Sequence, residues 1–241
     1  MTRIKCPVIS IEHYNEDTRQ ILLQAPDTQD AKFKAGQYLE MILPSKNCPF
    51  SIASSPNRNG VIELHIRPTP GSADSVEIED LLNSNPTHIE IDFPKGDCFL
   101  EAAPDNTLIL LAASTGVTQM KSIIEFLKPG GIKNPVYLYW GVIADKDLYL
   151  SSLFDEWANE HENFHYIPVV SEPDTSPEWT GKTGLVGEVV LSDFDSLSDV
   201  TVYVSGGPGM VYATLDAFME RGMPEKSMFS DIFSHAPRDK S

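Results

Sequence analysis

The sequence predicts a two-domain protein in which an antiparallel β-barrel over residues 1–102 is followed by a doubly wound α/β domain with a parallel sheet over residues 103–241. Three observations support this fold class. The length of 241 residues suits one to two domains. Short strand-like stretches separated by turns fill the first half, and near residue 103 the pattern changes to alternating strands and helices.

The first half is rich in short β-type stretches. The clearest is 61–67, where apolar and polar residues alternate as in a half-buried strand. Further strands are expected at residues 3–11, 19–24, 38–43, 50–53 and 88–93, and a helix at 75–83. Proline, glycine, asparagine and aspartate residues lie between these stretches and mark turns. About six short strands with one helix are typical of a small antiparallel barrel.

The second half alternates between apolar strands and helices. Residues 107–112 are uniformly apolar, as expected for a parallel strand that is buried on both faces. A helix should follow over 118–127 and end at Pro129-Gly130-Gly131. The remaining elements expected are strand 136–140, helix 150–160, strands 164–170 and 200–205, and helix 210–221. This alternation predicts a doubly wound parallel sheet.

The composition restricts the class of partner and the cellular compartment. Eighteen basic residues against thirty-five acidic ones leave a formal net charge of −17, which repels phosphate backbones and anionic lipid. We therefore expect no nucleic-acid and no membrane partner. The N-terminus has no apolar h-region, and no apolar run approaches the roughly 20 residues that cross a bilayer. Because Cys6, Cys48 and Cys98 are odd in number and far apart, we expect reduced thiols in a cytoplasmic protein.

One motif resembles a metal site. The segment His161-Glu162-Asn163-Phe164-His165 matches the H-E-x-x-H letters of zinc proteases. That chemistry requires both histidines on one face of a continuous helix, whereas residues 164–170 read as a strand. No third ligand is evident. We therefore expect no metal site here, and interpret His161 and His165 as surface residues.

Two loops rich in small residues follow predicted parallel strands, at 111–118 and 204–210. In a doubly wound sheet, ligands bind outside the carboxyl ends of the strands, where helix N-termini present free N–H groups to a pyrophosphate. Neither loop fits G-x-G-x-x-G, so each alone is equally consistent with an ordinary turn. Two such loops in one domain, each followed by a helix, indicate a dinucleotide site.

A further stretch, Cys48-Pro49-Phe50-Ser51-Ile52-Ala53-Ser54, reads by itself as an extended edge strand. Together with Ile62-Glu63-Leu64-His65-Ile66 it resembles the flavin-binding half of the ferredoxin–NADP reductase superfamily. The most similar group is the NAD(P)H:flavin oxidoreductases, the bacterial flavin reductases. Further matches follow in order at 89–96, 139–141, 203–208 and 228–233. The last is similar to the family's C-terminal strand, which reaches back toward the flavin.

The resemblance implies a flavin-binding barrel domain over residues 1–102 and an NAD(P)-binding domain over residues 103–241. Pro49, Phe50 and Ser51 would lie against the isoalloxazine ring. Ser51 would be the catalytic residue, because its hydroxyl would lie near flavin N5, the atom that accepts the hydride. His65 and Ile66 would offer backbone groups to the polar edge of the ring.

The resemblance also implies the residues that contact the nucleotide. The segment 114–118 would contact nicotinamide and ribose, and 206–208 would hold the dinucleotide over the flavin. The nucleotide-binding residues expected on this basis are Ser114, Thr115, Gly116, Thr118, Gly206, Gly207 and Pro208. The residues expected near the flavin in the C-terminal segment are Phe229, Asp231 and Phe233.

Three positions depart from the family pattern. Cys48 stands where the family has an arginine that helps to hold the flavin. Cys48 is expected among the flavin-binding residues by its position. Without the arginine, we do not expect the flavin to be held tightly. Ser114 replaces the first glycine of the usual glycine–threonine–glycine loop. The loop 142–147 has two acidic residues around one lysine, which is a poor site for a 2′-phosphate and favours NADH over NADPH.

The resemblance therefore predicts an enzyme, an NAD(P)H-dependent flavin reductase that treats free riboflavin, FMN or FAD as a second substrate. Reduced flavin would then serve a flavin-dependent oxygenase or reduce a ferric complex. One alternative is a reductase with bound FAD or FMN that passes electrons to a separate protein; the chain has no C-x₄-C-x₂-C cluster of its own. A second alternative is a non-catalytic binding or regulatory relative.

Overall fold

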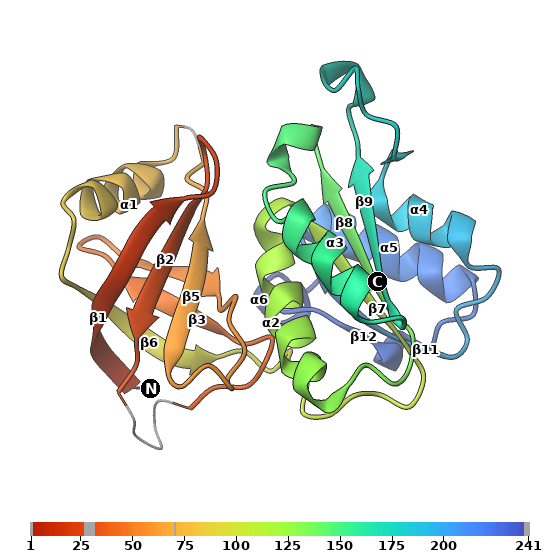
Figure 1. Cartoon of the computed structure of the whole chain (residues 1–241), viewed down its shortest axis with the longest axis horizontal. Coiled ribbons are helices and arrows are strands. Elements are labelled where there is room, and N and C mark those ends of the chain that lie inside the picture. The colour runs from red at the N-terminus through yellow and green to blue at the C-terminus, as the bar shows by residue number, and fades with distance from the viewer. Residues whose placement is uncertain (1, 27–31, 70, 239–241) are drawn as a thin grey trace. The chain divides into compact units, whose positions relative to one another are not determined.

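The computed structural model describes residues 2–26, 32–69 and 71–238 (Figure 1). The chain divides by its internal contacts into two compact units. We call the first the barrel unit; it comprises Met1–Glu101 together with Lys121–Phe126. The second, the α/β unit, comprises Ala102–Met120 and Leu127–Ser241.

The barrel unit is a six-stranded antiparallel sheet with one helix. Its strands are β1 (Thr2–His13), β2 (Arg19–Gln24), β3 (Tyr38–Ile42), β4 (Asn47–Ser51), β5 (Val61–Ile66) and β6 (His88–Lys95), and its helix is α1 (Ala73–Asn83). The strand order is β4-β3-β6-β1-β2-β5, so β4 and β5 are the two ends of the sheet. The strand predicted at 50–53 in fact begins at Asn47 and ends at Ser51. Pro49 does not prevent this, because a residue without an N–H is tolerated on an edge strand.

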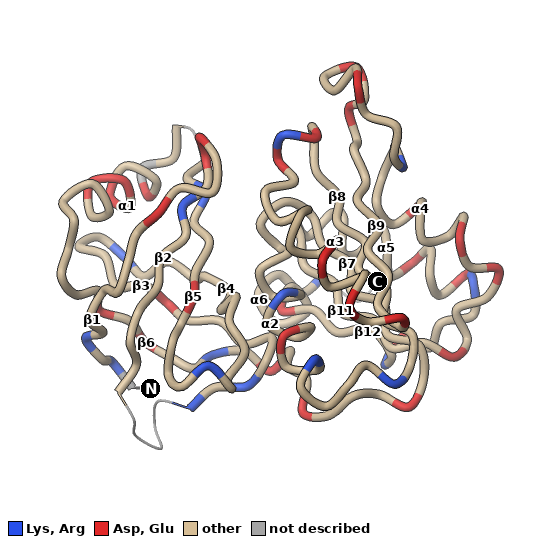
Figure 2. The backbone as a smooth tube through the Cα atoms, viewed as in Figure 1, with Lys and Arg blue, Asp and Glu red and all other residues tan. Residues whose placement is uncertain are grey.

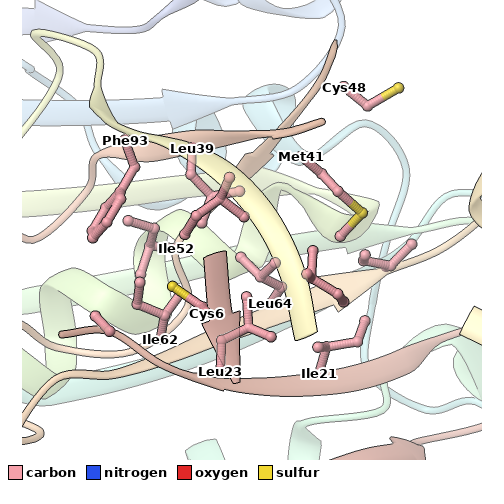
Figure 3. Close-up of a cluster of buried hydrophobic side chains, with 14 of the residues drawn as sticks. Cys6, Ile21, Leu23, Leu39, Met41, Cys48, Ile52, Ile62, Leu64 and Phe93 are labelled. Carbon is pink, nitrogen blue, oxygen red and sulfur yellow. The ribbon is translucent and has the colours of Figure 1, made fainter. Parts of the chain in front are cut away.

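The core of the barrel unit lies between the strands. Figure 3 shows Cys6 beside Ile62 and Leu23 and places Cys48 at the margin of the same cluster. Exposure alternates along β2 and β3, because successive side chains point to opposite faces, and the buried positions form this core. In β4, for example, Cys48 is buried while Pro49 is exposed.

The α/β unit is a six-stranded parallel sheet. Its strands are β7 (Thr107–Ala113), β8 (Val136–Val142), β9 (Phe164–Val170), β10 (Lys182–Thr183), β11 (Val200–Ser205) and β12 (Met228–Phe229), in the order β10-β9-β8-β7-β11-β12. Its helices are α3 (Ser151–Glu160), α4 (Val186–Asp193), α5 (Pro208–Glu220) and α6 (Ile232–His235), and it contains the two ends of α2 (Val117–Leu127), whose residues Lys121–Phe126 belong to the barrel unit. Both six-stranded sheets confirm the predicted fold class.

Helices cover both faces of the parallel sheet. Phe154 of α3 packs edge-on against Trp140 of β8, with ring centroids 5.9 Å apart. The neighbouring residue Tyr139 belongs instead to the core cluster that contains α4 and α5. Because adjacent side chains of a strand point to opposite faces, α3 lies on one face and α4 and α5 lie on the other.

Two parts of the second half differ from the prediction. Helix α4 and the short strand β10 were not predicted, because the valine-rich segment 186–191 has low intrinsic helix propensity. The strand expected over 228–233 ends at Phe229 and is followed by α6. The chain turns at Ser230, whose hydroxyl accepts a hydrogen bond from the Ile232 N–H and whose carbonyl accepts one from the Phe233 N–H. Across the described residues, no helix combines the length and apolar character needed to cross a membrane.

Candidate functional site

The two small-residue loops lie at the same edge of the parallel sheet. Strand β7 pairs with β11, with Ala112 opposite Ser205, and the carboxyl ends of both strands therefore meet. The loops touch at Gly116, where an added Cβ would lie 2.4 Å from the Ser205 carbonyl oxygen. Only glycine fits at this contact. The structure thus brings Ser114–Gly116 together with the loop that begins at Gly206.

The first loop is a 3₁₀ turn, η2 (Ser114–Gly116), with an unusual backbone conformation at its first residue. Ser114 has φ of +50°, in the left-handed region that side chains other than glycine rarely adopt. The indole N–H of Trp140 donates to the Ser114 carbonyl at 2.8 Å and holds the turn. Sequence reasoning did not identify this role of Trp140. The contact depends on the pairing of β8 with β7, which places Trp140 opposite Ala112, and no local pattern in the sequence indicates it.

The second loop leads into the N-terminus of α5. Gly207 is the N-cap and Pro208 is the first helical residue. A Cβ added at Gly207 or Gly209 would meet no atom within 4 Å, so this helix N-terminus is open to a ligand. Exposed N–H groups at a helix N-terminus suit a pyrophosphate, which is the fit expected of a dinucleotide.

The predicted nucleotide residue Thr118 has a different position. Its hydroxyl donates to the Thr115 carbonyl at 2.8 Å, and the residue is buried. Its side chain therefore stabilises the start of α2. A contact between Thr118 and the nucleotide remains a prediction.

Acidic residues occupy the loops that follow β8 and β9 (Figure 2). The first is the turn η4 (Asp145–Asp147), and the second contains Glu172 and Asp174. Ser176 joins them, because its hydroxyl donates to Asp145 Oδ1 at 3.0 Å and accepts from the Asp145 N–H at 2.9 Å. Lys146 is the one basic residue in these two loops. Their charge is unfavourable for a phosphate group.

The C-terminal residues predicted to lie near the flavin pack within the α/β unit. Phe229 stacks on Tyr203 with ring centroids 5.0 Å apart. Asp231 accepts a hydrogen bond from Gln119 of α2 at 3.1 Å. Phe233 packs against the core cluster that includes Val211 and Leu215 of α5. The structure thus fixes this segment against β11 and α2, and its approach to a flavin remains a prediction.

In the barrel unit, the outward face of β4 carries two of the predicted flavin contacts. Pro49 is exposed and Ser51 is half-buried, whereas Cys48 and Phe50 pack against the core. Within the described part of the chain, no protein group forms a hydrogen bond with the Ser51 hydroxyl. A half-buried hydroxyl without a protein partner is suited to a ligand.

At the end of β5, backbone groups rather than side chains lie at the edge of the sheet where a ligand could bind. The Glu63 carbonyl accepts from the Ala53 N–H at 2.8 Å, on the side of β5 that does not pair with β2. His65 follows two residues later and turns its own backbone groups to that same side. The side chains of His65 and Ile66 are buried. Any contact that His65 makes with a ligand at this edge is therefore through its backbone, whereas Ile66 turns its backbone groups toward β2 and its contact with a flavin remains a prediction.

The thiols of Cys6 and Cys48 are buried and not activated. Burial raises the pKa of the Cys6 thiol to about 11. Burial also raises the pKa of the Cys48 thiol, with a further contribution from Asp74 of α1. Both groups therefore stay protonated at neutral pH. Cys48 belongs to the core cluster that also contains Ile78 and Leu82 of α1, and its effect on flavin retention remains a prediction.

The H-E-x-x-H segment spans two elements. Helix α3 ends at Glu160, and β9 begins at Phe164. His165 lies in the strand, where it stacks on Tyr137 with ring centroids 4.5 Å apart. The two histidines therefore do not share the helix face that the zinc motif requires. The described residues contain no group of three or more His, Cys, Asp or Glu side chains placed to hold a metal ion.

Comparison with known proteins identifies the family of each half of the chain. Residues 5–99 match the oxidoreductase FAD-binding domain family, and residues 110–216 match the oxidoreductase NAD-binding domain family. The chain is 36% identical to the NAD(P)H-flavin reductase of Vibrio harveyi over 237 residues, covering 96% of this chain and 98% of that protein. It is 37% identical to a CDP-6-deoxy-L-threo-D-glycero-4-hexulose-3-dehydrase reductase of Yersinia pestis, covering 95% of this chain and 68% of that protein.

A solved structure shows the same two-domain fold. The cytochrome P450 reductase GcoB of Amycolatopsis superimposes with a TM-score of 0.85 at 26% identity, covering 95% of this chain and 69% of that chain. Both domain matches fall in the order that the sequence resemblance requires, with the FAD-binding domain first. The chain therefore belongs to the oxidoreductases that combine an FAD-binding domain with an NAD-binding domain, the family of the NAD(P)H-flavin reductases.

Proposed function

We propose that this enzyme transfers a hydride from NADH to free flavin, and so acts as an NAD(P)H-dependent flavin reductase. The observation that carries the proposal is the likeness to the Vibrio harveyi reductase across 98% of that protein's length. The open edge at Ser51 and the two glycine loops at the edge of the parallel sheet support it.

The protein's part in this reaction is to bind and orient, because the bound nicotinamide supplies a hydride from C4 and the flavin accepts it at N5. Ser51 would donate a hydrogen bond at the reacting edge of the flavin, next to Pro49 and Phe50. His65 and Ile66 would bind the polar edge of the ring through their backbone. These are the roles that the family resemblance implies for this chain.

The nucleotide would lie at the carboxyl edge of the parallel sheet. Ser114, Thr115 and Gly116 would contact nicotinamide and ribose, and the N-terminus of α5 at Gly207 and Pro208 would hold the pyrophosphate. Gly206 allows the loop its close approach to Ala113 and Met210.

The domain boundary that we propose between the flavin and nucleotide domains lies at residues 102 and 103.

We propose NADH as the preferred reductant. The acidic loops after β8 and β9 carry Asp145, Asp147 and Glu172 with one lysine between them. A carboxylate can accept a hydrogen bond from the ribose 2′-hydroxyl of NADH, whereas it repels the 2′-phosphate of NADPH. The expected result is a clearly higher kcat/KM for NADH than for NADPH.

A second candidate function is a reductase that retains its flavin and passes electrons to another protein. The likeness of 37% to the Yersinia pestis dehydrase reductase and the superposition on the cytochrome P450 reductase favour it. Reduction of free flavin remains our first proposal. Cys48 lacks the positive charge and the paired N–H donors of the guanidinium group that the family's arginine would offer to the flavin. A flavin-dependent oxygenase or a ferric complex would then take the reduced flavin. Cys6 and Cys48 form no disulfide, which agrees with the cytoplasmic location that we propose.

One assay separates these functions. Colourless purified protein should oxidise NADH only after riboflavin, FMN or FAD is added, and the rate should saturate with the added flavin. Protein that remains yellow through gel filtration would favour the second candidate. Negligible NADH oxidation with every flavin, by protein that still binds NADH, would favour a non-catalytic relative.

A further inference from the structure

A network of charged side chains is buried in the barrel unit around Glu63 of β5. The side chains of Glu63 and Lys121 are 2% and 3% exposed, and that of His65 is fully buried. The Lys121 ammonium lies 3.0 Å from Glu63 Oε2 and 2.5 Å from Glu125 Oε1. The Glu63 carboxylate accepts hydrogen bonds from Tyr14, Gln20, Arg58, His65 and Lys121.

The network keeps Glu63 ionised inside the protein. Burial alone would raise the pKa of this carboxyl, but the hydrogen bond from His65 and the charge of Lys121 hold its pKa well below the usual range. Burial lowers the pKa of His65, so the ring is neutral and donates from Nε2 to Glu63 Oε1 at 2.8 Å. A buried ion pair of this kind is weak evidence for a gain in stability, because apolar residues of similar volume often stabilise as well. We therefore consider how this charged network positions the strands around it.

The same segment of α2 also holds the chain that follows β4. The Ser122 hydroxyl donates to the Ser54 carbonyl at 2.7 Å, and the Ser55 N–H donates to Glu125 Oε2 at 2.9 Å. Lys121 and Ser122 are both buried. Three side chains of one helical turn thus contact Glu63 on β5 and the backbone of residues 54 and 55 directly after the Pro49-Phe50-Ser51 motif.

These contacts matter because β4 and β5 are the two ends of the sheet and do not pair along their length. The Ala53 N–H donates to the Glu63 carbonyl, and the Ser54 hydroxyl lies between the backbone groups of Val61 and Glu63. The side chains of α2 therefore contact both β5 and the segment that follows β4, beside the bonds that join them.

We propose that Lys121, Ser122 and Glu125 are positioning residues for the flavin. They fix the distance between Ser51 at the end of β4 and the His65–Ile66 backbone at the end of β5, although they lie within the segment that matches the NAD-binding domain family. This inference rests on the proposed function, because it assumes that the flavin ring binds between these two strand ends. Preorganised spacing matters for a rigid ring, since small displacements of its partners weaken both binding and reaction.

The test compares Lys121→Met with the double variant Glu63→Gln/Lys121→Met. The single variant leaves Glu63 with one cation fewer, and the double variant removes both buried charges and so removes the main reason for misfolding. Lys128→Met is the matched control, because Lys128 directly follows the end of α2 and pairs with the exposed Glu160 at 3.1 Å. Each protein is measured for unfolding by urea, for riboflavin Kd by fluorescence quenching, and for KM of riboflavin and of NADH.

We expect the riboflavin Kd and KM to rise by about tenfold in the single variant, with the KM for NADH unchanged. In the double variant, stability should recover toward wild type while the riboflavin Kd stays raised. Recovery of the riboflavin Kd together with stability would show a purely structural role and overturn the proposal. So would an unchanged Kd in folded Lys121→Met. Wild-type protein that binds riboflavin but does not reduce it would contradict the proposed function alone, because the Kd comparison would still stand.

Discussion

At the scale of single residues, Ser51 is the side chain whose surroundings point most directly to a ligand. It ends an edge strand and is half-buried, and within the described part of the chain its hydroxyl has no protein partner. Since removal of this hydroxyl breaks no hydrogen bond of the folded protein, Ser51→Ala should fold with wild-type stability.

We expect Ser51→Ala to slow hydride transfer by about ten- to a hundredfold, because one hydrogen bond to the reacting flavin is worth roughly 1–3 kcal/mol. The measurement is single-turnover flavin reduction after rapid mixing, which isolates that step. The KM for NADH should not change. An unchanged single-turnover rate would exclude a catalytic role for the hydroxyl, and a loss of stability would show that it serves packing.

Ser114 has a strained backbone conformation in the nucleotide loop. Its φ of +50° is strained for a residue with a Cβ, whereas glycine adopts it freely. Ser114→Gly should relieve about 1 kcal/mol of strain and lose about half of that to the greater freedom of glycine in the unfolded chain. Urea denaturation should therefore show a net gain of about 0.5 kcal/mol. A variant that is less stable than wild type would mean that the serine side chain itself supports the turn.

At the scale of elements, β5 combines an expected ligand-binding edge with a buried ionised network. Neutral His65 and ionised Glu63 both bind fewer protons in the folded protein than in the unfolded chain, because the pKa of each is lowered by folding. Stability therefore rises with pH wherever the unfolded chain takes up these protons. The contribution of His65 is present above its ordinary pKa of 6.5 and is lost as the pH falls below it.

We expect the unfolding free energy to fall as the pH is lowered from about 7 to 5, with His65 contributing up to about 1.4 kcal/mol per pH unit below its ordinary pKa. Glu63 adds to the loss below its ordinary pKa of 4.5. Urea denaturation at a series of pH values measures the slope. His65→Gln should flatten the slope below pH 6.5 and leave it unaltered at alkaline pH. Equal slopes in both proteins would contradict a neutral buried imidazole.

At the scale of the whole molecule, the net charge of −17 opposes every anionic ligand. Riboflavin is neutral and FMN carries a phosphate, so the field of the protein should disfavour FMN relative to riboflavin. Raising the salt concentration from about 50 to 500 mM screens this repulsion.

The ratio of kcat/KM for FMN to that for riboflavin should therefore rise with salt, while the value for riboflavin alone changes little. Steady-state assays at fixed, saturating NADH measure both quantities. A ratio that falls with salt would mean that a local cation attracts the phosphate, in spite of the net charge and of the cysteine at position 48.

The sequence by itself determined the elements whose residues decide their own conformation. The apolar run of β7 and the glycines after β7 and β11 act through local burial and backbone freedom, so their positions could be recognised. The alternation of residues 61–67 located β5 but wrongly predicted a half-buried strand, because the polar residues Glu63 and His65 are buried as well. The motif around Ser51 likewise identified the family. Local pattern did not reveal α4, because its valines favour a strand until the sheet beneath them buries that face of the helix.

Only the tertiary structure decided which distant residues meet. The pairing of β7 with β11 places Gly116 against Ser205, and the neighbouring strand β8 supplies the Trp140 indole that holds Ser114. The fold also brings Lys121, Ser122 and Glu125 against residues 54, 55 and 63, at sequence separations of about sixty to seventy residues. No periodicity encodes such contacts, because they depend on the closure of one element upon another. The buried charge of Glu63 follows from that closure, since the same glutamate in an isolated strand would be an ordinary solvated side chain.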